Sequence, residues 1–100
     1  DRKSPVTTEK EKYDIALGML KEGKLGEAEQ KFAEFITEFT SSSLQSNAYF
    51  WYAESFYQRN NHNEAAINYL KGYKLYPKGA KAADSLLKLA FSLSSLNRNK

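Results

Sequence analysis

The sequence contains no cysteine, and among its 100 residues only two are proline and five are glycine. Without cysteine the chain can form neither a disulfide framework nor a thiolate metal site. The scarcity of proline and glycine, together with abundant alanine, leucine, glutamate and lysine, favours helix. No stretch alternates β-branched and polar residues over the length of a strand, so we predict an all-α fold.

Several functional signatures are also missing. No apolar run approaches the roughly 20 residues that a membrane-spanning helix needs. The single histidine, His62, has no clustered metal ligands around it, so we expect it to cap or pack a turn, and we expect no metal and no other cofactor. Because we find neither an acid–base pair of carboxylates nor a glycine-rich phosphate loop, we expect a protein that is not an enzyme.

The charges are mixed, with 15 basic and 12 acidic side chains and a net charge of +3. Such a balance favours solubility and does not produce a strong field for nucleic acid. A modest basic strip with interleaved tyrosines is nevertheless present, and we interpret it as a solvated face. An acidic protein partner or an anionic envelope surface remains the alternative to that interpretation. The strip consists of Lys71, Lys74, Lys78, Lys81 and Lys88.

A repeat of 37 residues underlies the sequence. The segment GKLGEAEQKFAEF at 23–35 corresponds residue by residue to NNHNEAAINYLKG at 60–72. Small residues recur at fixed places, and antiparallel helices can cross closely only where a small side chain lies between them. We therefore predict two helix–turn–helix units and the first helix of a third. The small residues are Ala16, Ala53 and Ala90 in the first helices and Ala28 and Ala65 in the second helices.

The pattern predicts five helices, at about 9–22, 25–39, 45–59, 62–76 and 80–96. Thr8 with Glu11 and Asn61 with Glu64 have the spacing of capping boxes. Residues 1–8 are polar and are interpreted as a linker remnant, which indicates a domain cut from a longer chain with its targeting segment lost. The helical repeat domain then covers residues 9–100, with units at about 9–40, 45–77 and 80–97, the last one partial.

The spacing resembles that of the tetratricopeptide repeat, whose unit has about 34 residues. A closer resemblance covers about 85 residues. The blocks YDIALGMLKEGKLGEAEQKFAEFI, NAYFWYAESFYQRNNHNEAAINY and YPKGAKAADSLLKLAFSL resemble the C-terminal domain of the YbgF/CpoB family, the cell division coordinators associated with the Tol–Pal system. Ala83 and Ala90 depart from that pattern, which usually has proline and glycine there.

This resemblance implies a periplasmic protein without catalytic residues. Family members carry a signal peptide, an N-terminal trimerising coiled coil, which lies outside this sequence, and a linker before the helical repeats. They connect Tol–Pal, through TolA, to a bifunctional peptidoglycan synthase during outer-membrane constriction. The expected partners are therefore a TolA-like protein and, as a further possibility, the synthase. Related envelope proteins, such as the repeat lipoprotein of outer-membrane barrel assembly, share parts of the pattern.

The segment NAYFWYAESFY at 47–57 places six aromatic rings in eleven residues. Tyr49, Tyr52, Ala53 and Phe56 share one side of a helix and are predicted to be core, but a single stripe cannot bury every ring. In stacked helical hairpins the first helices line the concave side. The remaining side chains and their equivalents therefore predict a partner-binding groove. Its residues are Tyr13, Leu17, Leu20, Phe50, Trp51, Glu54, Tyr57, Leu87, Lys88 and Phe91.

A second hypothesis concerns the last helix. Because the third unit lacks its second helix, Leu86, Leu89 and Leu93 are predicted to be partly uncovered. The alternative function is thus self-association or assembly, as in an outer-membrane assembly lipoprotein. An adaptor that holds a protein segment in the groove remains the first hypothesis.

Overall fold

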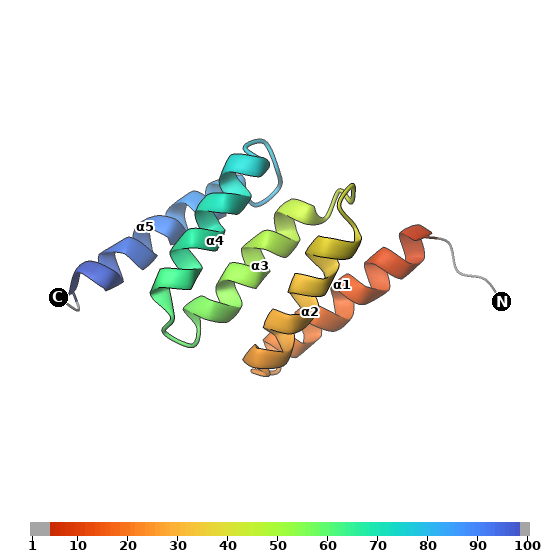
Figure 1. The fold of residues 1–100 in the computed structure, drawn as a ribbon, viewed down its shortest axis with the longest axis horizontal. Coiled ribbons are helices and arrows are strands. Elements are labelled where there is room, and N and C mark those ends of the chain that lie inside the picture. Colours follow the sequence, from red (N-terminus) through yellow and green to blue (C-terminus); the bar gives the residue numbers. More distant parts are fainter. Residues whose placement is uncertain (1–4, 99–100) are drawn as a thin grey trace.

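The computed structural model describes residues 5–98, with side chains from residue 8 onward. Within this range the chain forms helices and turns and no strand. Two helix–turn–helix units and the first helix of a third make up the predicted all-α repeat arrangement (Figure 1). No helix of the described range has the length and apolar character to cross a membrane. The helices are α1 (Pro5–Lys21), α2 (Leu25–Glu38), α3 (Gln45–Tyr57), α4 (His62–Leu75) and α5 (Ala82–Arg98).

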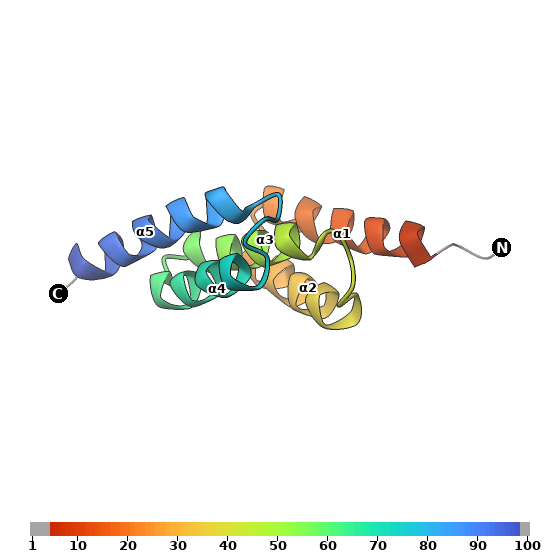
Figure 2. The ribbon, with the colours of Figure 1, turned by 90° about the horizontal axis from the view of Figure 1, so that it is seen from above.

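The helices form two layers. Seen from above, α1, α3 and α5 lie on one side and α2 and α4 on the other (Figure 2). Each helix packs mainly against its neighbours in the chain, with smaller contacts between α1 and α3 and between α3 and α5. The result is an elongated stack that measures 55 × 29 × 17 Å. Such a stack has two ends, and its stability is the sum of neighbouring contacts.

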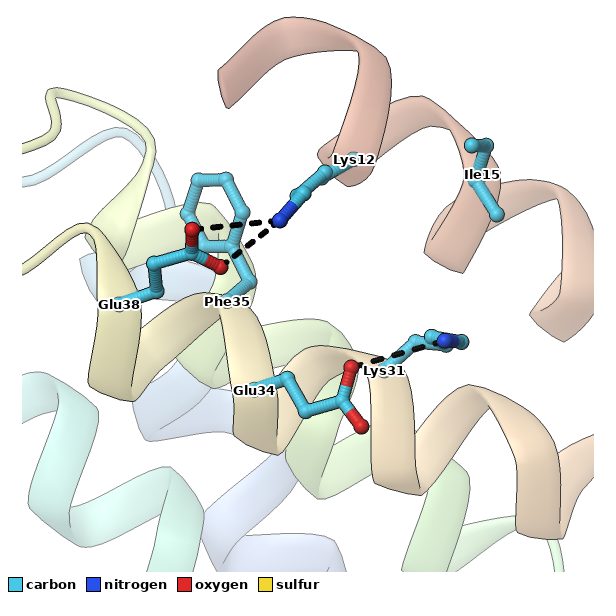
Figure 3. Close-up of a pocket in the computed structure, with 6 residues that line it drawn as sticks. All are labelled: Lys12, Ile15, Lys31, Glu34, Phe35 and Glu38. Atoms are coloured by element: carbon cyan, nitrogen blue, oxygen red, sulfur yellow. Dashed lines mark hydrogen bonds and ion pairs between the residues drawn. The ribbon is translucent and has the colours of Figure 1, made fainter. Parts of the chain in front are cut away.

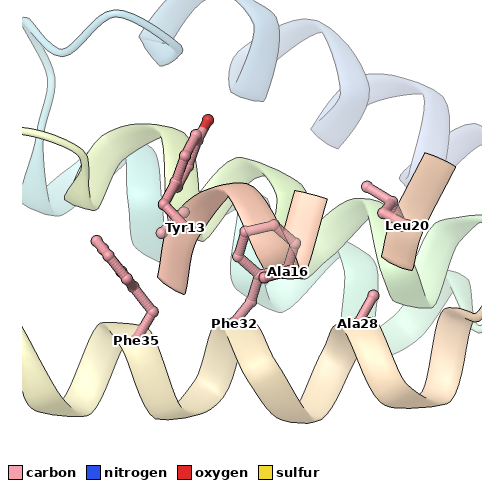
Figure 4. Packing of buried hydrophobic residues seen from close by; sticks show 7 residues of the cluster. Tyr13, Ala16, Leu20, Ala28, Phe32 and Phe35 are labelled. Carbon is pink, nitrogen blue, oxygen red and sulfur yellow. The ribbon is translucent and has the colours of Figure 1, made fainter. Parts of the chain in front are cut away.

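Alanines mark the helix crossings, as predicted. Ala16 of α1 and Ala28 of α2 have no exposed surface, and Phe32 and Phe35 fill the space beside them (Figure 4). The ring of Tyr13 meets both phenylalanine rings edge-on, with centroids 6.1 and 5.9 Å apart. Small residues thus set the distance between α1 and α2, and rings fill the gaps on either side.

The second unit repeats this packing with different rings. Ala53 of α3 and Ala65 of α4 have no exposed surface, and Tyr69 and Phe56 lie beside them. Ala90, the equivalent position of α5, is exposed. It is exposed because no helix in the described range crosses α5 at that point.

Two turns show why the repeat tolerates an asparagine in place of glycine. Gly23 ends α1 with a φ of 82°, and Lys24 N–H donates to the Met19 carbonyl at 2.9 Å. Asn60 ends α3 with a φ of 65°, and Asn61 N–H donates to the Phe56 carbonyl at the same distance. Both are Schellman caps, which need a left-handed residue that glycine and asparagine adopt most readily.

The predicted starts of α2, α3 and α4 agree with the structure, whereas α1 begins earlier and α5 later than predicted. The Asn61 side chain accepts a hydrogen bond from Glu64 N–H, so the predicted cap of α4 is confirmed. By contrast, α1 begins at Pro5, which places Thr8 inside the helix, and the predicted start at Thr8 is wrong. Proline is well suited to the first helical position because its φ is already helical and it lacks a donor. The described part of the predicted linker, 5–8, is therefore helical.

The turn before α3 is closed by a buried side chain. Gln45 Nε2 donates to the carbonyls of Phe39 at 2.6 Å and Ile36 at 3.2 Å. Both carbonyls lie at the C-terminal end of α2, where acceptors lack intrahelical donors, and the Phe39 carbonyl also accepts from Ser42 N–H at 3.0 Å. Gln45 thereby joins the two units at the turn between α2 and α3. In this turn Thr40 stands where the tetratricopeptide pattern usually has proline.

Gly72 allows the closest approach between α3 and α4. A β-carbon added there would lie 2.9 Å from the Tyr49 β-carbon. That distance is too short for two carbon atoms, so the crossing depends on the missing side chain.

We expect Gly72→Ala to destabilise the domain by about 1 kcal/mol. Alanine gains about 1 kcal/mol of helix propensity, but overpacking a tight crossing costs about 1–3 kcal/mol. Gly18→Ala is the control, since no heavy atom lies within 4 Å of its added β-carbon. That variant should be more stable than the unmodified chain by up to about 1 kcal/mol. Urea unfolding measures both, and a stabilised Gly72→Ala variant would contradict the tight crossing.

Candidate partner-binding face

The ten predicted groove residues all belong to the layer of first helices, but they differ in exposure. Leu87 and Phe91 of α5 are 55% and 47% exposed. The half-buried residues are Leu17, Trp51, Tyr57 and Lys88. The buried residues are Tyr13, Leu20, Phe50 and Glu54.

Phe50 is a core residue, so its predicted exposure on a groove is wrong. Only 7% of its surface is accessible. The Trp51 ring meets it edge-on at 5.0 Å, and the Tyr69 ring lies 5.6 Å away. Lys81, from the turn before α5, places its Nζ 5.3 Å from the Phe50 ring centre. Neighbouring elements therefore cover a ring that the geometry of α3 alone leaves outside the packed stripe.

Trp51 extends across to the preceding first helix. Its Nε1 donates a hydrogen bond to the Tyr13 hydroxyl at 2.9 Å. Lys81 Nζ lies 5.1 Å from the centre of the Trp51 ring, within the range of a cation–π interaction. Tyr13 is buried beneath this bridge. Leu20, two helical turns further along α1, is also buried. The predicted exposure of Tyr13 and Leu20 is therefore also wrong.

Lys88 makes the equivalent bridge one repeat later. It stands 37 residues after Trp51 and extends from α5 to α3. Its Nζ lies 3.2 Å from Glu54 Oε1 and 3.9 Å from the centre of the Tyr57 ring. The same repeat position thus joins successive first helices twice, once by a hydrogen bond and once by a charge.

Glu54 is a buried carboxylate held by three elements. Besides Lys88, the Tyr69 hydroxyl of α4 donates a hydrogen bond to it, and Gln58 Nε2 lies 3.5 Å away. Removing a carboxylate from water is costly unless a charge and hydrogen bonds replace the lost solvation. This cluster explains why Glu54 does not line an open groove as predicted. Burial, and then the hydrogen bond to Glu54, raise the pKa of Tyr69 well above its ordinary value.

Three lysines of the predicted basic strip lie over different aromatic rings. Lys71 Nζ lies 6.0 Å from the Tyr49 ring, whereas Lys81 covers Phe50 and Trp51 and Lys88 covers Tyr57. Their charges are spread over several helices instead of forming one continuous surface. The sequence showed these lysines but not their ring contacts, which join residues from 22 to 31 positions apart.

Four hollows on the described surface lie away from the ten predicted residues. One lies between α1 and α2, a second on α2 alone, a third between the α3–α4 turn and α5, and a fourth where α2, α3 and α4 meet. The first and fourth have volumes of about 190 and 200 Å³, whereas the second and third, at about 480 and 330 Å³, reach the roughly 300–1,000 Å³ of small-molecule sites. No group of three side chains suited to a metal ion occurs in the described range. His62 packs edge-on against Tyr57 at 4.9 Å, in agreement with a packing role.

We expect the stability of the domain to fall as the pH rises above about 10. The pKa of Tyr69 is raised in the folded chain, so the unfolded chain loses this proton first, and deprotonation favours unfolding. Burial raises the pKa of Tyr49 and Tyr52 in the same direction. Denaturant unfolding at several alkaline pH values measures how steeply the free energy of unfolding falls with pH. This slope should be smaller for Tyr69→Phe than for the unmodified chain. An equal slope in both proteins would contradict the role of Tyr69.

Comparison with known proteins gives no family for this chain. It matches no protein-family model, and it matches no curated protein. The repeat, the packing and the exposure of the described side chains are therefore the basis for proposing a function.

Proposed function

We propose that this chain is a non-enzymatic protein–protein interaction module that binds an extended segment of another protein along the first-helix layer, centred on α5. The observation that carries the proposal is the exposure of Leu87 and Phe91. They lie one turn apart on the helix, so their side chains share one side. Two large apolar groups open to water on one side are typical of a contact surface.

The surroundings of this pair supply specificity. Lys88 lies between the two residues in sequence and is fixed by Glu54 and Tyr57. Trp51 is half-buried and its ring is held by Tyr13, so it offers area without loss of side-chain entropy on binding. A partner segment with apolar side chains facing α5 fits this surface. The buried residues Phe50 and Glu54 support the surface from below and do not contact the partner.

The finer part of the proposal rests on the sequence resemblance to the YbgF/CpoB family. On that basis the module acts in the periplasm as a component associated with the Tol–Pal system. The proposed partner is a TolA-like protein, and a bifunctional peptidoglycan synthase is a second candidate. Binding would coordinate peptidoglycan synthesis with outer-membrane constriction during cell division, with the full-length protein a trimer through its coiled coil.

We expect the double variant Leu87→Ala/Phe91→Ala to bind the periplasmic part of a TolA-like protein about 30- to 700-fold more weakly. Each truncated anchor at the centre of an interface costs roughly 1–2 kcal/mol, and 1.4 kcal/mol corresponds to tenfold in affinity. Isothermal titration calorimetry with the purified partner measures the change.

The control variant is Leu86→Ala/Leu93→Ala on the same helix. These leucines are 48% and 52% exposed, so the two variants remove similar amounts of exposed apolar surface. The control should keep its affinity because residues 86 and 93 lie on a different side of α5. Undiminished binding by a folded Leu87→Ala/Phe91→Ala variant would refute the site.

A further inference from the structure

The two ends of the stack have opposite surface chemistry. At the end formed by α1 and α2, charged side chains surround a shallow hollow (Figure 3). Lys12 Nζ lies 3.0 Å from Glu38 Oε1, and Lys31 Nζ lies 3.5 Å from Glu34 Oε1. Ile15 is the exposed apolar residue of this end. The first end is thus closed by ion pairs, as the terminal units of soluble repeat stacks are.

The junction between the two units shows what covers the equivalent surface inside the stack. Adding 37 to Lys12 and Ile15 gives Tyr49 and Tyr52, which face α2 across a hollow that Ala33 and Ile36 also line. Lysine and isoleucine at the first end are thus replaced by two tyrosine rings at the junction between the two units.

The opposite end carries apolar residues at the positions that a neighbour covers elsewhere. Adding 37 to Ala33 and Ile36 gives Leu70 and Tyr73, and adding 37 to Tyr49 and Tyr52 gives Leu86 and Leu89. Ala90 and Leu93 correspond to Ala53 and Phe56, which α4 covers in the second unit. Leu70, Leu86 and Leu93 are 41%, 48% and 52% exposed. We name this surface the end face; it consists of Leu70, Tyr73, Leu86, Leu89, Ala90 and Leu93.

We propose that the end face is the interface of a closed, two-fold dimer of this chain. None of its six residues is charged, so a second copy brings no like-charge repulsion. A two-fold axis places apolar residues of one copy against the same residues of the other. This inference goes beyond the proposed function and uses a different side of α5 from Leu87 and Phe91.

The charged end excludes stacking of one copy on the next. In a head-to-tail arrangement the end face of one copy would cover Lys12, Lys31, Glu34 and Glu38 of its neighbour. Burying these ion pairs against leucine would remove their hydration without adding new partners. Association should therefore stop at two copies and not continue into a filament.

The spacing along α5 suits an antiparallel pair of helices. Leu86, Leu89 and Leu93 follow a three-and-four spacing, which places them along one stripe. If the two copies of α5 cross between residues 89 and 90, Leu86 of each copy lies beside Leu93 of the other. Ala90 at the centre permits a close crossing, as Ala16 and Ala53 do inside the stack.

Sedimentation equilibrium of the 100-residue chain tests this proposal. The average mass should rise with concentration from 11.4 kDa towards twice that value and no further. Leu86→Glu/Leu93→Glu should remain monomeric with unchanged helical content by circular dichroism. Leu87→Glu/Phe91→Glu, which places the same charges on another side of α5, should still form the dimer.

Three results would overturn the proposal. They are a monomeric parent chain, a dimer that survives Leu86→Glu/Leu93→Glu, and a mass that grows past the dimer. A monomer whose end face instead takes up an amphipathic helical peptide would assign the surface to a different occupant. None of these results bears on binding at Leu87 and Phe91, so this proposal and the proposed function fail separately.

Single cysteines give an independent measurement, because the chain has no cysteine of its own. Ala90→Cys lies at the centre of the proposed crossing, where two thiols of paired copies come close. On mild oxidation it should form a disulfide-linked dimer at least ~10-fold faster than Ile15→Cys at the charged end. Equal rates for the two variants would contradict the two-fold interface.

Discussion

Close helix crossings at alanine set the geometry of the whole domain. Ala16, Ala28, Ala53 and Ala65 have no exposed surface, and each stands where two helices meet. Because the crossings recur every 37 residues, each unit is placed on the last by the same contact. The distance between helices is fixed by these small side chains, and the rings only fill the volume that remains beside them.

A second set of contacts joins the helical hairpins to one another. Trp51 joins α3 to α1, and Lys88 joins α5 to α3 from the same repeat position. These bridges fill the space between first helices where stacked hairpins often hold a peptide. The bridge to the Tyr13 hydroxyl is the indole N–H of Trp51, and the bridge to the Glu54 carboxylate is the ammonium group of Lys88. Our proposal therefore places the partner segment at α5, which no further helix bridges within residues 5–98.

The sequence predicted the helices and their crossings well because both follow from local spacing. The buried alanines Ala16, Ala28, Ala53 and Ala65 and the exposed leucines Leu86 and Leu93 all stand at positions that the 37-residue repeat made visible. Phe50 and Glu54 were misjudged because a helical wheel describes one helix at a time. Lys81 and Tyr69, which cover them, come from a turn and a helix 15 to 31 residues away. The start of α1 was placed too late because a capping pattern at Thr8 was preferred to proline at the first helical position.

The exposure of a side chain in this stack depends more on which repeat unit it belongs to than on its residue type. Tyr13, Phe50 and Leu87 occupy the same repeat position, 37 residues apart, and their exposed fractions are 7%, 7% and 55%. Trp51 of the following first helix covers Tyr13. Tyr69 of α4 and Lys81 of the turn before α5 cover Phe50, whereas no such element covers Leu87 within residues 5–98. The same reasoning applies to Ala90. Its equivalents Ala16 and Ala53 are buried, whereas Ala90 itself is exposed on α5. Both surfaces that we propose for binding therefore include α5, on different sides of this last helix of the described range.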